Sequence, residues 1–214
     1  MISPQKSNFW FSISGILILI SVILTLITYF GKNPLIQYFS FYKDDFKNNF
    51  INFYSFQDTF FSFYEFWRLI SPIFIHFSIT HLIFNCLWIY ILGPRIINQN
   101  GIKNFLLLTF SSAILSNASE AYVSGLIIFG GLTGVIFAML GYCYAMEFIK
   151  NKSRYLLPPA IYIFMIGWLL IGYLGILESF GFGKIANTAH LIGLISGILS
   201  VSYTHLTLPT TEYV

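Results

Sequence analysis

Apolar residues gather along the chain in six long runs, separated by short stretches that carry most of the charged and amide side chains. The runs lie at about residues 9–30, 74–93, 103–119, 131–149, 155–176 and 185–202. A helix of about 20 apolar residues crosses a bilayer core of roughly 30 Å, and several runs are near the lower limit of that length. We therefore expect an all-α fold, a polytopic membrane helical bundle with six transmembrane helices.

The same pattern divides the chain into four parts. Residues 1–30 hold a first transmembrane helix, residues 31–68 an outer loop, and residues 69–202 a core of transmembrane helices two to six. Residues 203–214 are rich in threonine, include a proline and show no helical period. We expect them to be a disordered tail or sequence foreign to the domain, so His205 is not a candidate functional residue.

The outer loop combines charged residues with fifteen aromatic residues between Tyr38 and Trp67. One interpretation is an ordinary solvated loop, which agrees with the charges. Aromatic rings, however, favour the membrane–water interface. They favour a second interpretation, in which short amphipathic pieces of this loop lie on the outer leaflet or partly in it.

Composition supports a membrane protein and excludes other classes. The chain of 214 residues is 57% hydrophobic and only 9% charged, with a mean hydropathy of +0.76. No soluble domain of this size requires so much apolar material. The net charge of +3 is too small and too scattered for nucleic-acid binding. Cys86 and Cys143 lie inside apolar runs, so we expect packing residues rather than a disulfide.

Lysine and arginine indicate the orientation, because they concentrate on the cytoplasmic side of membrane proteins. With the N-terminus inside, the inner segments carry six basic and two acidic residues, whereas the outer segments carry five basic and six acidic residues. The basic cluster at 150–154 contributes most clearly to this difference. We expect both termini on the inner side, an N-in, C-in topology.

The stretch Phe129-Gly130-Gly131-Leu132-Thr133-Gly134 opens the fourth apolar run. Glycines permit a tight turn and the close approach of another backbone, and Gly134 leaves the flank of Thr133 uncovered. The Thr133 hydroxyl is therefore a candidate nucleophile at the mouth of a membrane helix. The alternative is a loop-to-helix turn in which Thr133 only caps the helix.

Strongly polar groups inside membrane helices are costly and usually functional. Run two contains His76, His81 and Asn85, and run six contains Asn187 and His190. His81 and Asn85 are four residues apart, so they share a helix face from which both could hydrogen-bond a developing oxyanion. Each of these side chains could instead simply lock the packing of neighbouring helices.

The last run places small residues after its histidine. Gly193 and Gly197 have a spacing that lets two membrane helices approach closely. Run six could therefore press against the glycine-rich start of run four and bring His190 to Thr133. A neutral imidazole there could accept the hydroxyl proton. The combination is more specific than any of its parts.

These motifs resemble the rhomboid family of intramembrane serine proteases, in its six-helix bacterial GlpG type, over about residues 65–202. The matching stretches are Trp67-Arg68, 76–85 with its two histidines and asparagine, the glycine before Pro94, Gly130–Gly134, Gly141 and Ala186–Gly193. The resemblance implies an endopeptidase of the bacterial plasma membrane that cleaves transmembrane segments of other proteins. It implies no cofactor and no metal, and the partners it implies are transmembrane substrates and the lipid bilayer.

The resemblance also implies a role for each site residue. Thr133 takes the nucleophile position and His190 that of the base, whereas His81 and Asn85, with the backbone at Leu132, form the oxyanion hole. Structural positions near the site are His76, Gly131, Gly134, Phe137, Asn187 and Gly193.

Three positions depart from the family pattern. Threonine replaces the family's serine at 133, and its extra methyl group restricts χ1 and crowds a tight site. Ile97 stands where the bacterial type has a glutamate. Phe137 stands where a tyrosine packs on the base, and its ring can still stack against His190.

Other classes agree less well with the sequence. An aspartyl intramembrane protease needs two membrane-embedded aspartates, but Asp44, Asp45 and Asp58 all lie in the outer loop. A zinc protease needs a His-Glu-x-x-His motif, which is absent, and there is no internal repeat of the kind expected of a transporter. The serious alternative is a rhomboid pseudoprotease, which would bind transmembrane helices without cleaving them.

Overall fold

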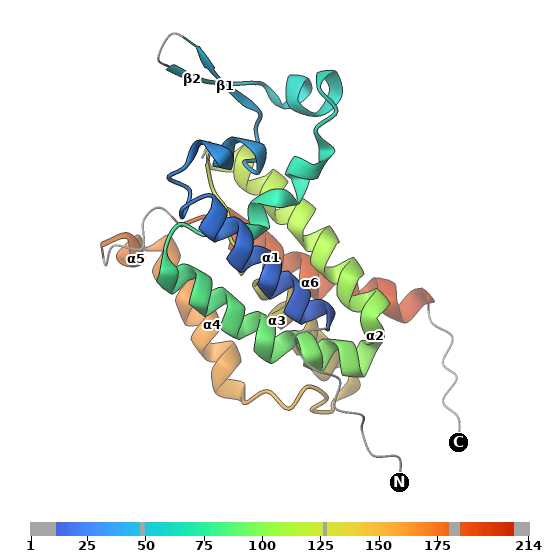
Figure 1. Ribbon diagram of the computed structural model, residues 1–214. Coiled ribbons are helices and arrows are strands. Elements are labelled where there is room, and N and C mark those ends of the chain that lie inside the picture. Colours follow the sequence, from blue (N-terminus) through green and yellow to red (C-terminus); the bar gives the residue numbers. More distant parts are fainter. Residues whose placement is uncertain (1–11, 48–49, 126–127, 180–184, 208–214) are drawn as a thin grey trace.

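The fold is mostly helical, with the helices gathered in one bundle and a small hairpin outside it (Figure 1). It is a computed structural model that describes residues 12–47, 50–125, 128–179 and 185–207. The helices are α1 (Ile13–Ile27), α2 (Ile79–Val123), α3 (Thr133–Lys150), α4 (Pro159–Tyr173), α5 (Ile176–Ser179) and α6 (Asn187–Thr207).

Helix α2 is two helices joined at a bend. Gly101 has φ 82° and ψ 163°, a conformation that side-chain-bearing residues rarely adopt, so the helix turns a corner there. We call residues 79–100 the first arm and residues 102–123 the second arm. Figure 1 shows the arms meeting in a V. Apolar runs two and three therefore correspond to two helices, the first and the second arm, that meet at this bend.

Length and composition bear on which helices could cross a membrane. Within the described ranges, Ile79–Val123 is long and apolar enough, and Ile13–Ile27, Pro159–Tyr173 and Asn187–Val201 are shorter apolar helices. Because Ile79–Val123 bends at Gly101, its length belongs to two arms rather than to one straight span. The number of spans therefore stays a prediction.

Helix α3 forms the centre of the bundle. Every residue from Thr133 to Cys143 is buried, and the partner that covers α3 most extensively is α6. A Cβ atom at Gly193 would overlap the carbonyl of Gly134, and one at Gly197 would overlap the carbonyl of Ala138. The two backbones touch where the small-residue spacing predicts a close approach.

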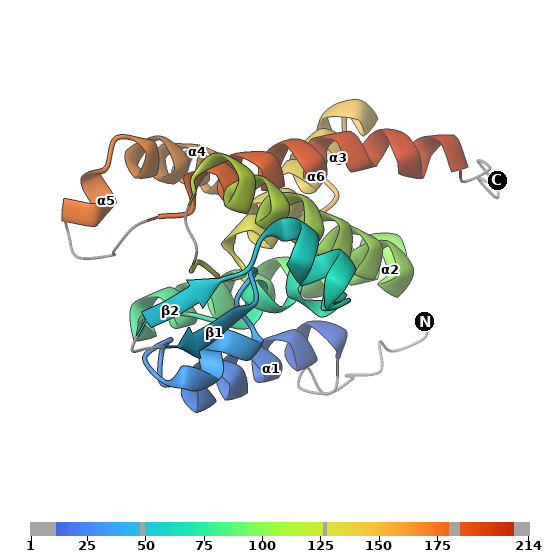
Figure 2. The same cartoon turned by 90° about the horizontal axis from the view of Figure 1, so that it is seen from above.

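The remaining helices enclose this pair. Seen from above, α1 and α6 lie on opposite faces of the bundle, with α2 and α3 between them (Figure 2). Helix α4 joins the start of α6 through Asn187, whose side-chain amide donates to the Gly172 carbonyl at 3.0 Å. Cys86 and Cys143 are free thiols in the structure, and Cys143 is buried.

The segment before α2 contains a feature that the sequence analysis did not predict. Strands β1 (Asp44–Lys47) and β2 (Phe50–Phe53) pair antiparallel, with Asp44 opposite Phe53. Aromatic and β-branched residues favour such pairing, which the hydrophobic period of the membrane runs does not reveal. Short helical turns make up much of the rest, at Pro34–Tyr38, Asp58–Ser62, Phe66–Leu69 and Ser71–Phe74.

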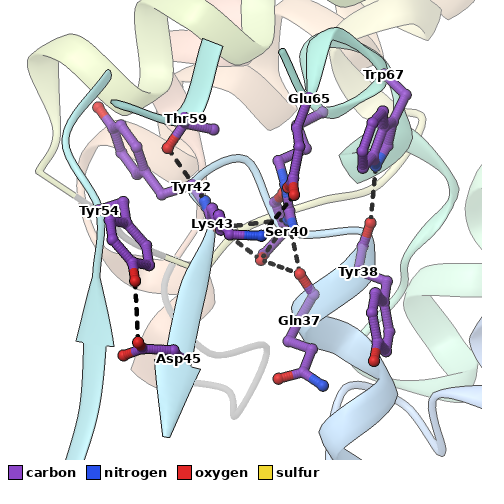
Figure 3. A network of polar contacts seen from close by, with 11 residues as sticks. Gln37, Tyr38, Ser40, Tyr42, Lys43, Asp45, Tyr54, Thr59, Glu65 and Trp67 are labelled. Carbon is purple, nitrogen blue, oxygen red and sulfur yellow. Dashed lines mark hydrogen bonds and ion pairs between the residues drawn. The ribbon is translucent and has the colours of Figure 1, made fainter. Parts of the chain in front are cut away.

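A network of charged groups holds this segment together, and we call it the Glu65 network (Figure 3). The Glu65 carboxylate accepts from Lys43 Nζ at 2.6 Å and from Arg68 Nε at 2.5 Å. Arg68 is buried and also donates to the carbonyls of Gln37 and Ser40, at 2.6 and 2.8 Å. Burial alone would raise the pKa of Glu65, but the hydrogen bonds from Lys43 and Arg68 outweigh it and hold the pKa below its ordinary value.

The aromatic residues of this segment divide into two groups. Phe41 and Phe60 are buried in a small second core with Phe129 and Ala121, beside the glycine-rich stretch. Tyr38, Phe61, Tyr64 and Trp67 are exposed. The exposed rings keep the interfacial interpretation open as a prediction, whereas the buried ones attach the segment to the bundle.

The C-terminal boundary differs from the expected one. Helix α6 continues to Thr207, so residues 203–207 are helical, contrary to the prediction of a disordered tail from residue 203. A short sequence without an evident period can still extend an existing helix, because propagation costs less than nucleation. Residues 208–214, the rest of the predicted tail, lie outside the described residues.

Candidate active site

The glycine-rich stretch is held in a narrow space between the start of α2 and the segment before it. The Gly131 amide donates to the Pro72 carbonyl at 3.1 Å. A Cβ atom at Gly130 would lie 2.5 Å from the Pro72 oxygen, and one at Gly131, where φ is +109°, would lie 2.5 Å from His81 Nε2. Both positions require glycine, Gly131 for conformation as well as for space.

Thr133 is the first residue of α3, and Leu132 occupies the N-cap position. The Thr133 hydroxyl donates to Asn85 Oδ1 at 3.0 Å and lies 3.3 Å from His81 Nε2. It therefore makes side-chain contacts across the bundle and does not cap the helix. The alternative interpretation, in which Thr133 only caps α3, is wrong for this reason.

The two side chains opposite this hydroxyl also pack against Gly131. A Cβ atom there would meet His81 Nε2 and, at 3.3 Å, Asn85 Nδ2. Asn85 is fully buried, and its Nδ2 has no hydrogen-bond partner among the residues that the structure describes. A buried amide donor without a partner is costly. Two polar side chains, His81 and Asn85, thus pack directly against Gly131, two residues before Thr133.

The start of α3 contributes further donors. The first amides of a helix have no acceptor inside the helix, and the helix dipole makes that end partly positive. No side chain caps α3 at Leu132. The Leu132 amide itself donates to His76 Nε2 at 3.5 Å, so the unoccupied amides begin at Thr133 rather than at Leu132.

His76 links three parts of the fold. It lies before α2, which begins at Ile79 and not at residue 74 as the apolar pattern indicates. Its Nδ1 is 3.3 Å from the Thr25 hydroxyl of α1, its Nε2 accepts from Leu132, and its ring meets the His81 ring edge-on at 4.9 Å. These contacts fix the His81 ring and the turn before Thr133.

His190 lies in the first turn of α6 and is 7% exposed. Its ring stacks on Phe137, with centroids 5.2 Å apart and planes 23° apart, which confirms that phenylalanine at this position can stack on the imidazole. Phe137 is one turn beyond Thr133 on the same face of α3. Among the described residues, no hydrogen bond joins Thr133 Oγ1 to the His190 ring.

The other predicted positions lie around this group. Gly134 is where α2, α3 and α6 meet, since a Cβ atom there would lie 2.8 Å from Ser116 Oγ and 3.2 Å from the Ala189 carbonyl. Gly193 faces Gly134, whereas Asn187 turns away and joins α4. Ile97 packs against the main core.

One residue near this site was not predicted. Glu120, near the end of the second arm, is buried, and its Oε2 accepts from the Ala189 amide at 2.8 Å. The sequence analysis counted Glu120 only as an outer charge. A signal was present, because Ser112, Ser116 and Glu120 recur every four residues on one face of an apolar run.

The arrangement combines a hydroxyl, an imidazole and several donors aimed at one point. These are the parts that acyl transfer through a hydroxyl nucleophile requires. The described residues contain no group of three or more histidine, cysteine or acidic side chains that could hold a metal ion.

Comparison with known proteins gives a consistent answer. A family model described as a Rhomboid domain matches residues 64–206. The protein named Rhomboid protease GlpG from Serratia proteamaculans (strain 568) is 31% identical over 86% of this chain and 59% of its own length. Those of Yersinia pestis (strain Pestoides F) and Yersinia pseudotuberculosis serotype O:3 (strain YPIII) are 37% identical over 63% of this chain. The chain spans 59% and 47% of the lengths of the Serratia and Yersinia relatives.

Proposed function

Because this chain belongs to the rhomboid family, we propose that it is an intramembrane endopeptidase that cleaves transmembrane segments of other membrane proteins. Thr133 is the nucleophile and His190 the general base. The observation that carries the proposal is the Thr133 hydroxyl at the uncapped start of α3, opposite His81 and Asn85 and one turn from the ring that stacks on His190. The reaction needs no metal and no cofactor.

The chemistry follows from the roles of these groups. The Thr133 oxygen attacks the scissile carbonyl carbon while its proton passes to the His190 imidazole. The carbonyl oxygen gains negative charge and is held by His81, by Asn85 Nδ2 and by the free amides at the start of α3. The imidazolium returns the proton to the leaving amine, and water then hydrolyses the acyl-enzyme with His190 again as the base.

In the structure, the Thr133 hydroxyl points to Asn85 rather than to the proposed base. The hydroxyl donates to Asn85 Oδ1, whereas attack requires it to donate to His190. The proposed reaction therefore requires the Thr133 side chain to rotate about χ1. The threonine methyl group makes such a turn harder than it is for serine.

The test compares four proteins in detergent on a generic fluorogenic transmembrane substrate. We expect cleavage by the parent, a loss of about a thousandfold or more in Thr133→Ala and His190→Ala, and faster cleavage by Thr133→Ser. Serine lacks the methyl group, so its hydroxyl can rotate more freely toward the base. A misplacement of the reacting atom by about 1 Å can cost about a hundredfold in rate. Unchanged cleavage in Thr133→Ala and His190→Ala would remove both assignments.

The second candidate function is a pseudoprotease that binds transmembrane helices without cleaving them. The hydrogen bond that directs the Thr133 hydroxyl to Asn85 favours it. The same experiment separates the two functions. Silence from both the parent and Thr133→Ser, with substrate still captured in a pull-down, would favour the pseudoprotease.

We propose six membrane crossings with both termini inside a bacterial plasma membrane. Two basic residues of the expected inner side, Arg95 and Arg154, lie at one end of the bundle: Arg95 Nε donates to the Tyr155 carbonyl at 3.1 Å, and the Arg154 amide donates to Glu147 at 2.9 Å. The test labels single cysteines introduced at the exposed Ser62 and Ser153, in a Cys86→Ala, Cys143→Ala background, with an impermeant maleimide. Position 62 should react in intact cells and position 153 only after lysis; the reverse pattern would invert the topology.

A further inference from the structure

Glu120 is a carboxylate in a place where carboxylates are costly. It belongs to the second arm of α2, it is 1% exposed, and its neighbours on the same face are the buried Ser112 and Ser116. Burial of a charged group is tolerated only when hydrogen bonds compensate for lost solvation. The bond that compensates here runs from the Ala189 amide to Glu120 Oε2, at 2.8 Å.

That bond reaches the residue directly before His190. Ala189 lies in the first turn of α6, where the backbone amides have no acceptor within the helix. The N-terminal end of a helix is partly positive, so a nearby negative charge stabilises it. The His190 amide donates to the Ala186 carbonyl at 3.2 Å. Glu120 therefore holds the backbone from which the imidazole projects.

The same turn is fixed from two other sides. On the α3 side, the Ala189 carbonyl packs closely against Gly134: a Cβ atom added at Gly134 would lie 3.2 Å from the carbonyl oxygen. On the α4 side, Asn187 donates to Gly172 at 3.0 Å. Of these three supports, the one from α2 is the only one that brings a charge.

The charge matters because the proposed reaction protonates His190. Titratable side chains near the first turn of α6 are His81 and Glu120 from α2 and Tyr173 from α4, which hydrogen-bonds Thr188. The residues of α3 on this side, Thr133 and Phe137, carry no charge. The other carboxylates whose side chains are described lie elsewhere: Glu147 pairs at the opposite end of the bundle, and Asp44, Asp45, Asp58 and Glu65 belong to the outer segment.

We propose that Glu120 is a positioning residue for His190, which fixes the first turn of α6 and whose negative charge stabilises the imidazolium formed during acylation. This inference rests on the proposed protease function. It gives the dyad an acidic partner that acts through the backbone of the base helix rather than by direct contact with the ring.

The test uses Glu120→Gln, which keeps a hydrogen-bond acceptor but removes the charge, and Glu120→Ala, which removes both. The matched control is Glu147→Gln, the same change in a carboxylate that accepts from the Arg154 and Tyr155 amides at 2.9 Å. Cleavage is measured across pH in the more active of the parent and Thr133→Ser backgrounds. Amide hydrogen exchange of residues 187–193 is measured in the parent background.

We expect Glu120→Gln to lower kcat about tenfold at unchanged KM. The acidic limb of its rate profile should move to lower pH, because the imidazole loses a negative charge that favours its protonated form. Glu120→Ala should also speed exchange in 187–193, whereas Glu147→Gln should change neither property. A purely structural cap would leave kcat and the acidic limb of Glu120→Gln at the parental values, and that result overturns the proposal.

The exchange measurement separates this proposal from the proposed function. If no background cleaves substrate, the protease function fails, and exchange in 187–193 alone decides the positioning role. Exchange in Glu120→Ala equal to that of the parent would then overturn the role of Glu120 as well.

Discussion

At the scale of single residues, the site depends on which partner the Thr133 hydroxyl has. It donates to Asn85, so the side chain that is proposed to bind the oxyanion holds the nucleophile in the resting state. In the proposed mechanism Asn85 therefore has two roles in turn: its Oδ1 holds the hydroxyl, and its Nδ2, buried without a hydrogen-bond partner among the described residues, binds the substrate oxygen.

The consequence can be tested with Asn85→Ala. We expect kcat to fall about 10²–10³-fold, as for the loss of one oxyanion donor, with KM nearly unchanged. Thermal stability should change little, because the loss of the hydrogen bond from Thr133 is offset by the removal of a buried amide donor that has no partner among the described residues. Asn117→Ala serves as the control, since its amide donates at 2.9 Å to the Leu69 carbonyl, away from Thr133. Equal losses of activity in both variants would argue for a general packing role of Asn85.

The residue types of the site could be predicted from sequence, but their pairing could not. The i, i+4 spacing of His81 and Asn85 indicates a shared face, and both side chains indeed reach Thr133. Spacing does not reveal a rotamer, so the bond between Thr133 and Asn85 was out of reach. Nor does it reveal Glu120, because its partner is a backbone amide 69 residues away.

At the scale of secondary-structure elements, the approach of α3 to α6 sets the geometry of the dyad. The contact consists of backbone against backbone, at Gly193 with Gly134 and at Gly197 with Ala138. A single added methyl group has no room there, and the imidazole one turn before Gly193 would move with the helix.

Gly193→Ala tests this contact. Overpacking of this kind costs about 1–3 kcal/mol, so the melting temperature should fall and activity should fall with it. The control is Gly167→Ala in α4, where a Cβ atom would meet nothing within 4 Å. There the change should be neutral or stabilise by about 0.5–1 kcal/mol, because alanine is the better helix former. A melting temperature of Gly193→Ala equal to that of Gly167→Ala would contradict the close contact.

The elements themselves were mostly predictable. Long apolar runs marked the helices, because both the lipid and the core of the bundle favour apolar side chains along a helix. The hairpin Asp44–Phe53 was missed, because short strands outside the bundle are specified by local pairing rather than by a long apolar run. Runs two and three were predicted as separate helices, and the structure separates them at Gly101; the direction of the bend depends on the φ and ψ angles of that glycine, which periodicity does not reveal.

At the scale of the whole molecule, the outer segment is held together by its own charged groups and is packed against the bundle. The Glu65 network fastens the chain before the hairpin to the chain before α2, and Phe41 and Phe60 pack beside Phe129. The turn that carries Thr133 is therefore supported from outside as well as by the helices.

This support should depend on pH. The pKa of Glu65 is lower in the folded protein than its ordinary value, so its ionisation stabilises the fold above the unfolded pKa, and that contribution is lost as the pH falls through the folded pKa. Melting temperatures measured from about pH 6 to pH 3 should fall more steeply for the parent than for Glu65→Gln. Asp58→Asn, which alters a carboxylate bonded to Ser55 and Ser62, should keep the parental slope. Parallel curves for the parent and Glu65→Gln would refute this role.

Because α2 bends at Gly101, a small change of the angle between its two arms moves the far end of each arm by a large distance. Its first arm, residues 79–100, is about 33 Å long at 1.5 Å per residue, so opening the bend by one degree moves the tip by about 0.6 Å. One tip carries His81 and Asn85, and the other carries Glu120, the partner of the base helix. A single glycine at the far end of the bundle thus sets the distance between the two parts of the proposed active site, and a small change of angle there becomes a displacement large enough to matter for the proposed chemistry.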